Sequence, residues 1–201
     1  MTTVGTEQQS LAWNTELTKS LLFTAAVAEF TEYGLAGARM DRIAATASVN
    51  KERIYQYFGN KEALFDKVLA AKQEQLDKEL YRLCTDGHLS VEELAGGVFD
   101  FYAADPGNAR FWFWAALEKG SATRLTGLEN TKAVLASLQE TAGLSENAAR
   151  ELLLTLMTLC SASTALPQLE ALIPDSSASR VHSRRKHIVE AVTLLAAAAS
   201  Q

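Results

Sequence analysis

The sequence predicts an all-α protein of about nine helices, divided into a small N-terminal lobe and a larger C-terminal lobe. Three observations support this fold class. Apolar residues recur three and four positions apart along most of the chain, which is the spacing of an amphipathic helix. No segment shows the strict alternation of a half-buried strand. Only three of the 201 residues are proline, so few positions would interrupt a helix.

The composition is that of a folded protein. Apolar residues make up 48% of the chain and charged residues 21%, whereas a disordered chain would be less apolar. The N-terminal stretch MTTVGTEQQS lacks the basic and apolar regions of a signal peptide, and no apolar run reaches the roughly 18 residues that span a bilayer. We therefore expect a cytoplasmic protein without a membrane segment. Its two cysteines, Cys84 and Cys160, are expected to be reduced, buried thiols.

The N-terminal lobe is predicted to hold three helices and the start of a fourth. In the first helix, Leu22, Ala26 and Phe30 recur at four-residue steps, and Gly34 supplies the stop. Gly59 and Asn60 then separate the third helix from a long fourth one, with Asn60 as its N-cap. The predicted ranges are 15–33, 40–47, 51–58 and 61–84.

The C-terminal lobe is predicted to contain five further helices. Ser90 and Glu93 form a capping-box pattern that starts the first of them, which runs to about Ala104. The sequence DPGN predicts a turn before the next helix. The remaining predicted ranges are 109–119, 128–141, 146–166 and 179–199.

Residues 40–58 predict a helix-turn-helix. Apolar residues at positions 43, 44 and 47 give the first of its two helices one apolar face, and Ile54 and Phe58 share a face of the second. On a helical wheel of about 100° per residue, positions 52, 53, 55 and 56 lie opposite Ile54. The second helix is therefore expected to bury Ile54 and Phe58 and to present a polar face. Such a helix fits the DNA major groove, which is about 12 Å wide.

The chemistry of this polar face suits DNA. Between Arg39 and Lys61 the sequence has five basic and two acidic residues, a net charge of +3, although the whole chain carries −5. Arg53 can form a bidentate contact with a guanine edge, and Gln56 with adenine. Lysine and tyrosine side chains suit phosphates, which set the register without carrying sequence information. The alternative is a solvated amphipathic face, which two tyrosines on one short helix argue against.

The segment LLFTAAVAEFTEYGLAGARMDRIAATASVNKERIYQYFGNKEALFDKVL resembles the DNA-binding domain of the TetR family of transcriptional regulators. The resemblance rests on an A-A-x3-F-x3-G spacing, on DRIAATASV and on IYQYFGNKEALF. It implies a DNA-binding domain over 10–60, a connecting helix over 61–84, and a ligand-binding and dimerisation domain over 61–201. The residues implied to read bases are Lys51, Glu52, Arg53 and Gln56, and those implied to contact the DNA backbone are Arg39, Tyr55, Tyr57, Asn60 and Lys61.

One position departs from the family pattern. Ala38 stands where the family usually has a Thr or Ser that caps the second helix. Loss of such a cap is expected to cost about 1 kcal/mol of local stability unless Asp41 or another neighbour takes its place.

In the larger lobe, the last two helices are predicted to form a homodimer interface. The segment LLLTLMTLCSAS is apolar around most of its circumference, so it must be covered on several sides. A dimer would explain recognition of a two-fold operator, whose half-sites lie about 34–36 Å apart or at a multiple of that distance. The alternative is a wholly intramolecular core.

The segment ARFWFWAALEKG places aromatic residues on every side of one helix, so at least one ring should face something other than the main core. A pocket for an apolar or aromatic small molecule is one interpretation, and simple core or interface packing is the other. The candidate pocket residues are Phe99, Tyr102, Phe113, Trp114, Leu117 and Met157.

The sequence as a whole predicts a homodimeric, ligand-responsive DNA-binding regulator, and most simply a repressor that a small apolar or aromatic effector releases. It shows no catalytic dyad, phosphate-binding loop or metal-ligand spacing, so we expect no enzyme activity, no metal and no cofactor. One rival is a helical protein-interaction module that does not bind DNA. The other is an enzyme with a fortuitous helix-turn-helix.

Overall fold

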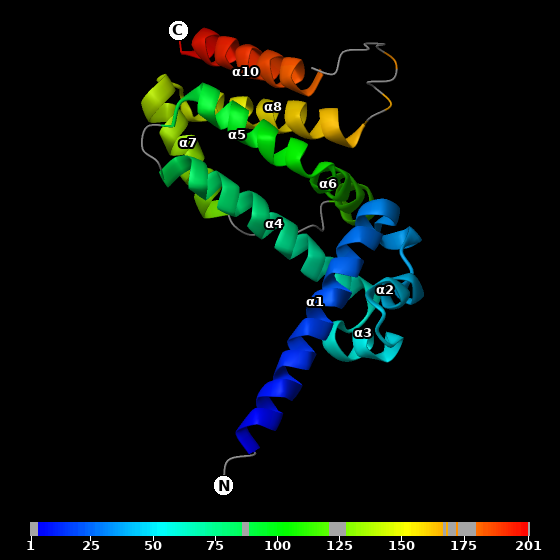
Figure 1. Ribbon diagram of the computed structural model, residues 1–201. Coiled ribbons are helices and arrows are strands. Elements are labelled where there is room, and N and C mark those ends of the chain that lie inside the picture. Colours follow the sequence, from blue (N-terminus) through cyan, green and yellow to red (C-terminus); the bar gives the residue numbers. More distant parts are fainter. Residues whose placement is uncertain are drawn as a thin grey trace. The chain divides into compact units, whose positions relative to one another are not determined.

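The computed structural model describes residues 4–85, 89–120, 128–166, 168, 172 and 180–200. Nine helices account for most of these residues, and no β-strand occurs among them (Figure 1). The predicted all-α fold is thereby confirmed. The helices are α1 (Val4–Gly37), α2 (Met40–Ala47), α3 (Lys51–Phe58), α4 (Lys61–Thr85), α5 (Val91–Ala104), α6 (Pro106–Lys119), α7 (Leu128–Ala142), α8 (Glu146–Ala165) and α10 (Arg180–Ala199).

Two helices begin earlier than their sequence patterns predicted. Helix α1 starts at Val4, whereas its predicted start was residue 15. Helix α6 starts at Pro106 because proline is well suited to a first helical position, where no N–H donor is needed. Asp105 supports this start, since its Oδ1 accepts a 3.0 Å hydrogen bond from the Gly107 N–H. The DPGN segment is therefore the beginning of a helix and not a turn before it.

The chain divides into two compact units. Unit 1 consists of Met1–Ala71 and Trp114–Ala122, and unit 2 consists of Lys72–Phe113 and Thr123–Gln201. Helices α4 and α6 each contribute residues to both units. The division thus falls inside α4, and the last turns of α6 belong to the unit that contains α1, α2 and α3.

Unit 1 has a small apolar core. Ile43 from α2 and Ile54 from α3 are fully buried, as are Leu22 and Phe30 from α1. The ring of Phe30 meets that of Phe65, on α4, edge to face at a centroid distance of 5.1 Å. Helix α2 packs on both α1 and α3. This core holds α3 through its apolar side.

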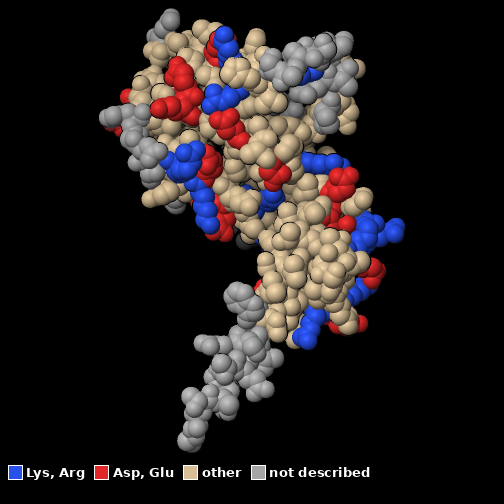
Figure 2. Space-filling view, viewed as in Figure 1, with Lys and Arg blue, Asp and Glu red and all other residues tan. Residues whose placement is uncertain are grey.

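Unit 2 is a helical bundle in which α5, α8 and α10 pack on one another and α7 packs on α8 (Figure 1). Its core includes Phe99 and Tyr102 from α5 and Leu156 and Cys160 from α8. The predicted capping box starts α5: the Ser90 hydroxyl accepts the Glu93 N–H, and the Glu93 carboxylate accepts the Ser90 N–H. On the face shown in Figure 2, acidic and basic side chains of this unit lie intermixed.

Candidate DNA-binding surface

Helices α2 and α3 are joined by a three-residue turn that the local sequence supports. Ser48 adopts the left-handed conformation (φ 54°), and its N–H bonds back to the Ala45 carbonyl at 3.1 Å. Asn50 then caps α3, its side chain accepting the Glu52 N–H at 3.2 Å. The sequence analysis did not assign this cap. The predicted bounds of both helices are confirmed, since α2 spans Met40–Ala47 and α3 spans Lys51–Phe58.

The inner face of α3 is held by Ile54, which is fully buried as predicted. Phe58 was also expected to be buried, but it is only half-buried because it occupies the last turn of the helix. Its ring lies 6.4 Å from that of Phe23, and the Lys67 ammonium lies 5.3 Å from its centroid. Gly59 ends the helix with a φ of 82°, a conformation that favours glycine.

The outer face of α3 is polar and exposed. Glu52, Arg53, Tyr55 and Gln56 all point to solvent. Nη1 of Arg53 donates a 2.9 Å hydrogen bond to Oε1 of Gln56. Three of the four residues implied to read bases therefore lie together on the surface. The fourth, Lys51, is half-buried, and its ammonium pairs with the Asp41 carboxylate at 2.7 Å, which raises the pKa of Lys51.

The residues implied to contact the DNA backbone differ in exposure and in the contacts that they make. Arg39 and Asn60 are exposed, and Tyr57 is half-buried with the Lys19 ammonium 5.6 Å from its ring centroid. Asn60 caps α4 as predicted, accepting the Ala63 N–H at 2.8 Å. Lys61 is half-buried, and its Nζ lies 3.4 Å and 3.3 Å from the carbonyls of Ala36 and Ala38.

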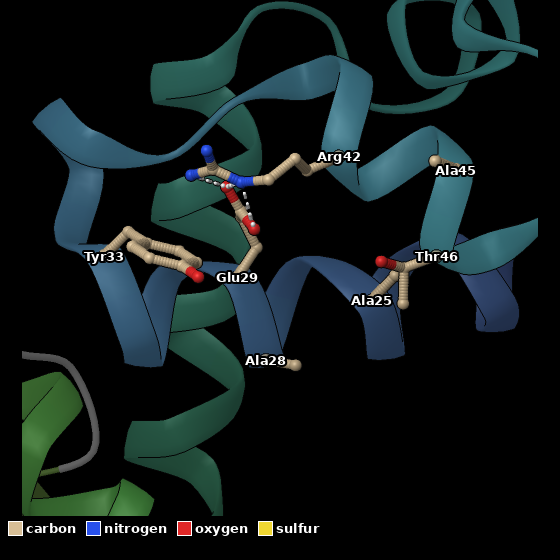
Figure 3. A pocket seen from close by; sticks show the side chains of 7 residues that line it. All are labelled: Ala25, Ala28, Glu29, Tyr33, Arg42, Ala45 and Thr46. Carbon is tan, nitrogen blue, oxygen red and sulfur yellow. Dashed lines mark hydrogen bonds and ion pairs between the residues drawn. The ribbon is translucent and has the colours of Figure 1, made fainter.

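The start of α2 is held by a residue that the sequence analysis missed. Arg39 occupies the N-cap position, and its side chain makes no capping hydrogen bond. Glu29, on α1, accepts the Arg39 N–H at 2.8 Å and also pairs with the guanidinium of Arg42 (Figure 3). The signal available in the sequence was an acidic residue within the apolar stripe of the first helix, one turn after Ala25 and Ala26.

A shallow hollow of about 340 Å³ lies around this Glu29–Arg42 pair, within unit 1 (Figure 3). The Arg42 guanidinium lies 4.2 Å from the ring centroid of Tyr33. The hydrogen bond to Glu29 raises the pKa of Arg42. The hollow is lined by Ala25, Ala28, Glu29, Tyr33, Arg42, Ala45 and Thr46.

The candidate effector-pocket residues belong to both units and differ in burial. Phe99 and Tyr102 are buried in the core of unit 2, and Met157 packs against that core. Phe113 and Leu117 are exposed, as expected for a helix with aromatic or apolar residues on every side. Trp114 belongs to unit 1, where its ring lies against Gly34.

The two helices implied to form the dimer interface carry exposed apolar residues. On α8, Leu154 is 61% exposed, while Leu152, Leu153 and Leu156 are buried. On α10, Leu194 is 71% exposed, and Val181 and Leu195 are also exposed.

Neither cysteine forms a disulfide, with Cys160 buried and Cys84 half-buried. Among the described helices, none combines the length and hydropathy needed to cross a bilayer.

Comparison with known proteins assigns both parts of the chain. Residues 22–68 match the family of bacterial regulatory proteins described as the tetR family, and residues 90–193 match the tetracyclin repressor-like C-terminal domain. The transcriptional repressor SCO4008 of Streptomyces coelicolor is 42% identical over 110 residues, which cover 53% of this chain and 54% of that protein. The transcriptional repressor NicS of Pseudomonas putida is 33% identical over 98 residues, covering 47% of this chain and 46% of NicS. The chain spans about half the length of these curated relatives.

Solved structures extend the similarity over nearly the whole chain. SCO4942 of Streptomyces coelicolor, described as a candidate transcriptional regulator, is 28% identical with a TM-score of 0.69, over 89% of this chain and 97% of that one. A protein of Mesorhizobium loti, described as a candidate tetR-family regulator, is 19% identical with a TM-score of 0.65, over 92% of this chain and 97% of that one. The second likeness concerns the fold alone.

Proposed function

Because this chain belongs to the TetR family of bacterial regulatory proteins, we propose that it is a homodimeric transcriptional repressor that binds a two-fold DNA operator and responds to a small molecule. The observation that carries the proposal is the arrangement of α3. Its apolar side is anchored through fully buried Ile54, and its opposite side exposes Arg53 and Gln56. An exposed arginine and amide on one short, rigid helix match the donor and acceptor pattern of the major groove.

The residues of this surface would make two kinds of DNA contact, to base edges and to phosphates. Arg53 and Gln56 would read base edges together with Glu52 and Lys51. For this, the Lys51 ammonium would have to leave its ion pair with Asp41 and bind DNA. Arg39, Tyr55 and Asn60 are exposed at positions where they can meet phosphates. Tyr57 and Lys61 are half-buried, so each would contact a phosphate through the exposed end of its side chain. A chromosomal partner would place the protein in the cytoplasm.

The exposed leucines of unit 2 support a dimer through α8 and α10. Leu154 and Leu194 are each more than half exposed, and Val181 and Leu195 of α10 are exposed as well. Covering them with the same helices of a second copy would give a self-complementary interface, as a two-fold axis requires. The two recognition helices would then reach half-sites about 34–36 Å apart, or at a multiple of that spacing.

The effector is proposed to be a small apolar or aromatic molecule that enters the core of unit 2. Phe99, Tyr102 and Met157 supply an aromatic and polarisable environment there. An effector changes operator occupancy only through its different affinities for the DNA-binding and non-binding states, a coupling of about 1–3 kcal/mol. Because α4 and α6 have residues in both units, they are the helices through which this coupling would pass.

Selection of bound sequences from a random duplex pool tests the proposal. We expect the purified protein to enrich an inverted repeat and to protect both half-sites in a footprint. Small apolar and aromatic compounds can then be screened for release of this operator. Enrichment of no sequence at low ionic strength would contradict the proposal, and enrichment of a single half-site by a monomer would contradict its dimeric part.

A further inference from the structure

Helix α2 begins in an unusual way, and its beginning affects the whole candidate DNA-binding surface. The first N–H groups of a helix have no partner within the helix, and a Ser, Thr, Asp or Asn side chain at the N-cap ordinarily accepts one of them. Here the N-cap is Arg39, which has no side-chain acceptor, and Ala38 precedes it. The Asp41 carboxylate, in the first turn, pairs instead with the Lys51 ammonium at 2.7 Å.

Glu29 supplies from another helix what α2 itself lacks. In a capping box, a Glu at the third helical position accepts the N–H of the N-cap residue. The third position of α2 is Arg42, which can only donate. Glu29 accepts the N-cap N–H in its place, at 2.8 Å from Arg39 N, and binds Arg42 through the same carboxylate. A Glu–Arg pair across two helices thus replaces a box that would normally lie within one.

The Glu29 carboxylate is buried and well bonded, whereas the Arg42 side chain is 36% exposed. Glu29 is only 8% exposed, and both of its carboxylate oxygens accept from Nε of Arg42, at 2.8 Å and 3.1 Å. Nη2 of Arg42 donates to the Gly37 carbonyl at 2.9 Å, and the guanidinium lies against the ring of Tyr33. Figure 3 shows the guanidinium and the carboxylate facing each other across the space between α1 and α2. Removing Arg42 would leave the buried Glu29 carboxylate without its charge partner, which is costly.

We propose that Glu29 is a positioning residue for DNA binding, which sets the start of α2 and thereby the orientation of Arg39 and of α3. The inference rests on the proposed function. Glu29 binds the backbone N–H of Arg39, and the side chain of Arg39 is implied to contact a phosphate. Helix α2, which begins after Arg39, packs directly on α3. A shift at the start of α2 would therefore move both a backbone contact and the recognition helix.

Three substitutions at Glu29 and Arg39 test the proposal. Glu29→Met keeps a side chain of similar length but removes both acceptors, whereas Glu29→Gln keeps one neutral acceptor. Arg39→Ser installs an N-cap acceptor within α2 itself. Each variant and the Glu29→Met/Arg39→Ser double variant is titrated with the operator selected by the wild-type protein, well below its melting temperature. Glu140→Gln, which changes an exposed carboxylate of α7, is the control.

We expect Glu29→Met to raise the operator Kd about five- to tenfold, which is the fold-change that corresponds to the typical free-energy contribution of one helix cap. Glu29→Gln should raise the Kd less. In the Arg39→Ser background the same Glu29→Met change should raise the Kd at most about threefold, because the new cap replaces part of what Glu29 provides. Circular dichroism at the titration temperature should show full helix content in every variant. The control should bind like the wild type.

Three outcomes overturn the inference while leaving the proposed function intact. The first is a Glu29→Met variant that binds as tightly as the wild type. The second is an equal Kd increase in both backgrounds, which means that Glu29 does not act through the cap. The third is a lower melting temperature with no change in Kd for Glu29→Gln, which assigns it a purely structural role. Failure of the wild-type protein to bind any duplex would instead contradict the proposed function.

Discussion

Arg53 and Gln56 lie one helical turn apart on the exposed face of α3, and Nη1 of Arg53 donates a 2.9 Å hydrogen bond to the amide oxygen of Gln56. Two of the four implied base readers therefore contact each other on the surface of α3. A bidentate contact between Gln56 and adenine uses both its amide oxygen and its amide nitrogen, so binding must share or replace this bond. The readout of neighbouring base pairs should be coupled through it.

Arg53→Ala is expected to relax sequence preference by about 1–3 kcal/mol, measured as the ratio of operator and scrambled-duplex affinities. Because Arg53 contacts Gln56, the double variant with Gln56→Ala should lose less preference than the sum of the single losses. Lys78→Ala, which changes an exposed lysine of α4, serves as the control and should preserve the ratio. Equal losses on operator and scrambled DNA would remove Arg53 as a base reader.

Lys61→Ala should weaken binding to all duplexes and reduce the slope of log affinity against log salt by about one unit, as loss of one phosphate contact does. The structure also offers a second role, since Nζ of Lys61 lies within 3.4 Å of the Ala36 and Ala38 carbonyls. An unchanged slope with a lower melting temperature would assign Lys61 to that backbone contact and not to DNA.

Gly34→Ala should destabilise unit 1, because Gly34 has a φ of 66° and the Trp114 ring occupies the space that a Cβ would need. The backbone angles of Gly34, φ 66° and ψ −174°, lie in a region that costs a non-glycine residue about 1–3 kcal/mol, and the steric conflict adds to this. Gly143→Ala is a matched control, since Gly143 has the same φ of 66° with no atom within 4 Å of the new Cβ. Urea denaturation should give the larger loss for Gly34→Ala, and equal losses would show that the Trp114 contact has no effect.

Leu194→Glu should break the proposed dimer, because it places a charge among the exposed apolar residues of α10. Sedimentation velocity should report a monomer, and operator binding should weaken because the two half-sites are no longer bound together. Tyr81→Glu changes a residue of α4 that is 58% exposed and should leave the dimer intact. A dimeric Leu194→Glu variant would place the interface elsewhere.

Alkaline pH should destabilise unit 2 through Tyr102. Burial raises the pKa of Tyr102 from its ordinary value of 10.0 to about 12, so the folded state retains a proton that the unfolded chain loses. The contribution of Tyr102 to the free energy of unfolding is fully present below pH 10. It is lost as the pH rises toward 12, and the loss amounts to roughly 2–3 kcal/mol.

The Tyr102→Phe variant lacks this titration, so the free energy of unfolding of the variant should fall less steeply over the same pH range. Burial raises the pKa of Cys160 to about 12 as well, which adds to the fall in both proteins. Parallel pH profiles for the two proteins would contradict the assignment to Tyr102.

The bounds of α2 and α3 were predictable because both helices are short and amphipathic, and their ends carry local signals. Ile54 had to face inward because α3 has few other apolar residues, and this orientation left Arg53 and Gln56 exposed. The pairing of Glu29 with Arg42 was not predictable, because it depends on how α1 and α2 approach each other. The inclusion of Trp114 in unit 1 likewise reflects tertiary packing, since in sequence it is one more aromatic residue of α6.

The salt dependence of DNA binding by the wild-type protein tests the central claim most directly. Affinity for a duplex that carries the selected inverted repeat is measured by fluorescence anisotropy between about 50 and 200 mM salt, alongside a scrambled duplex. We predict a slope of several log units per log unit of salt on both duplexes, with tighter binding to the repeat at every concentration. Affinity that is independent of salt, or identical for the two duplexes, would contradict the assignment of α3 as a recognition helix.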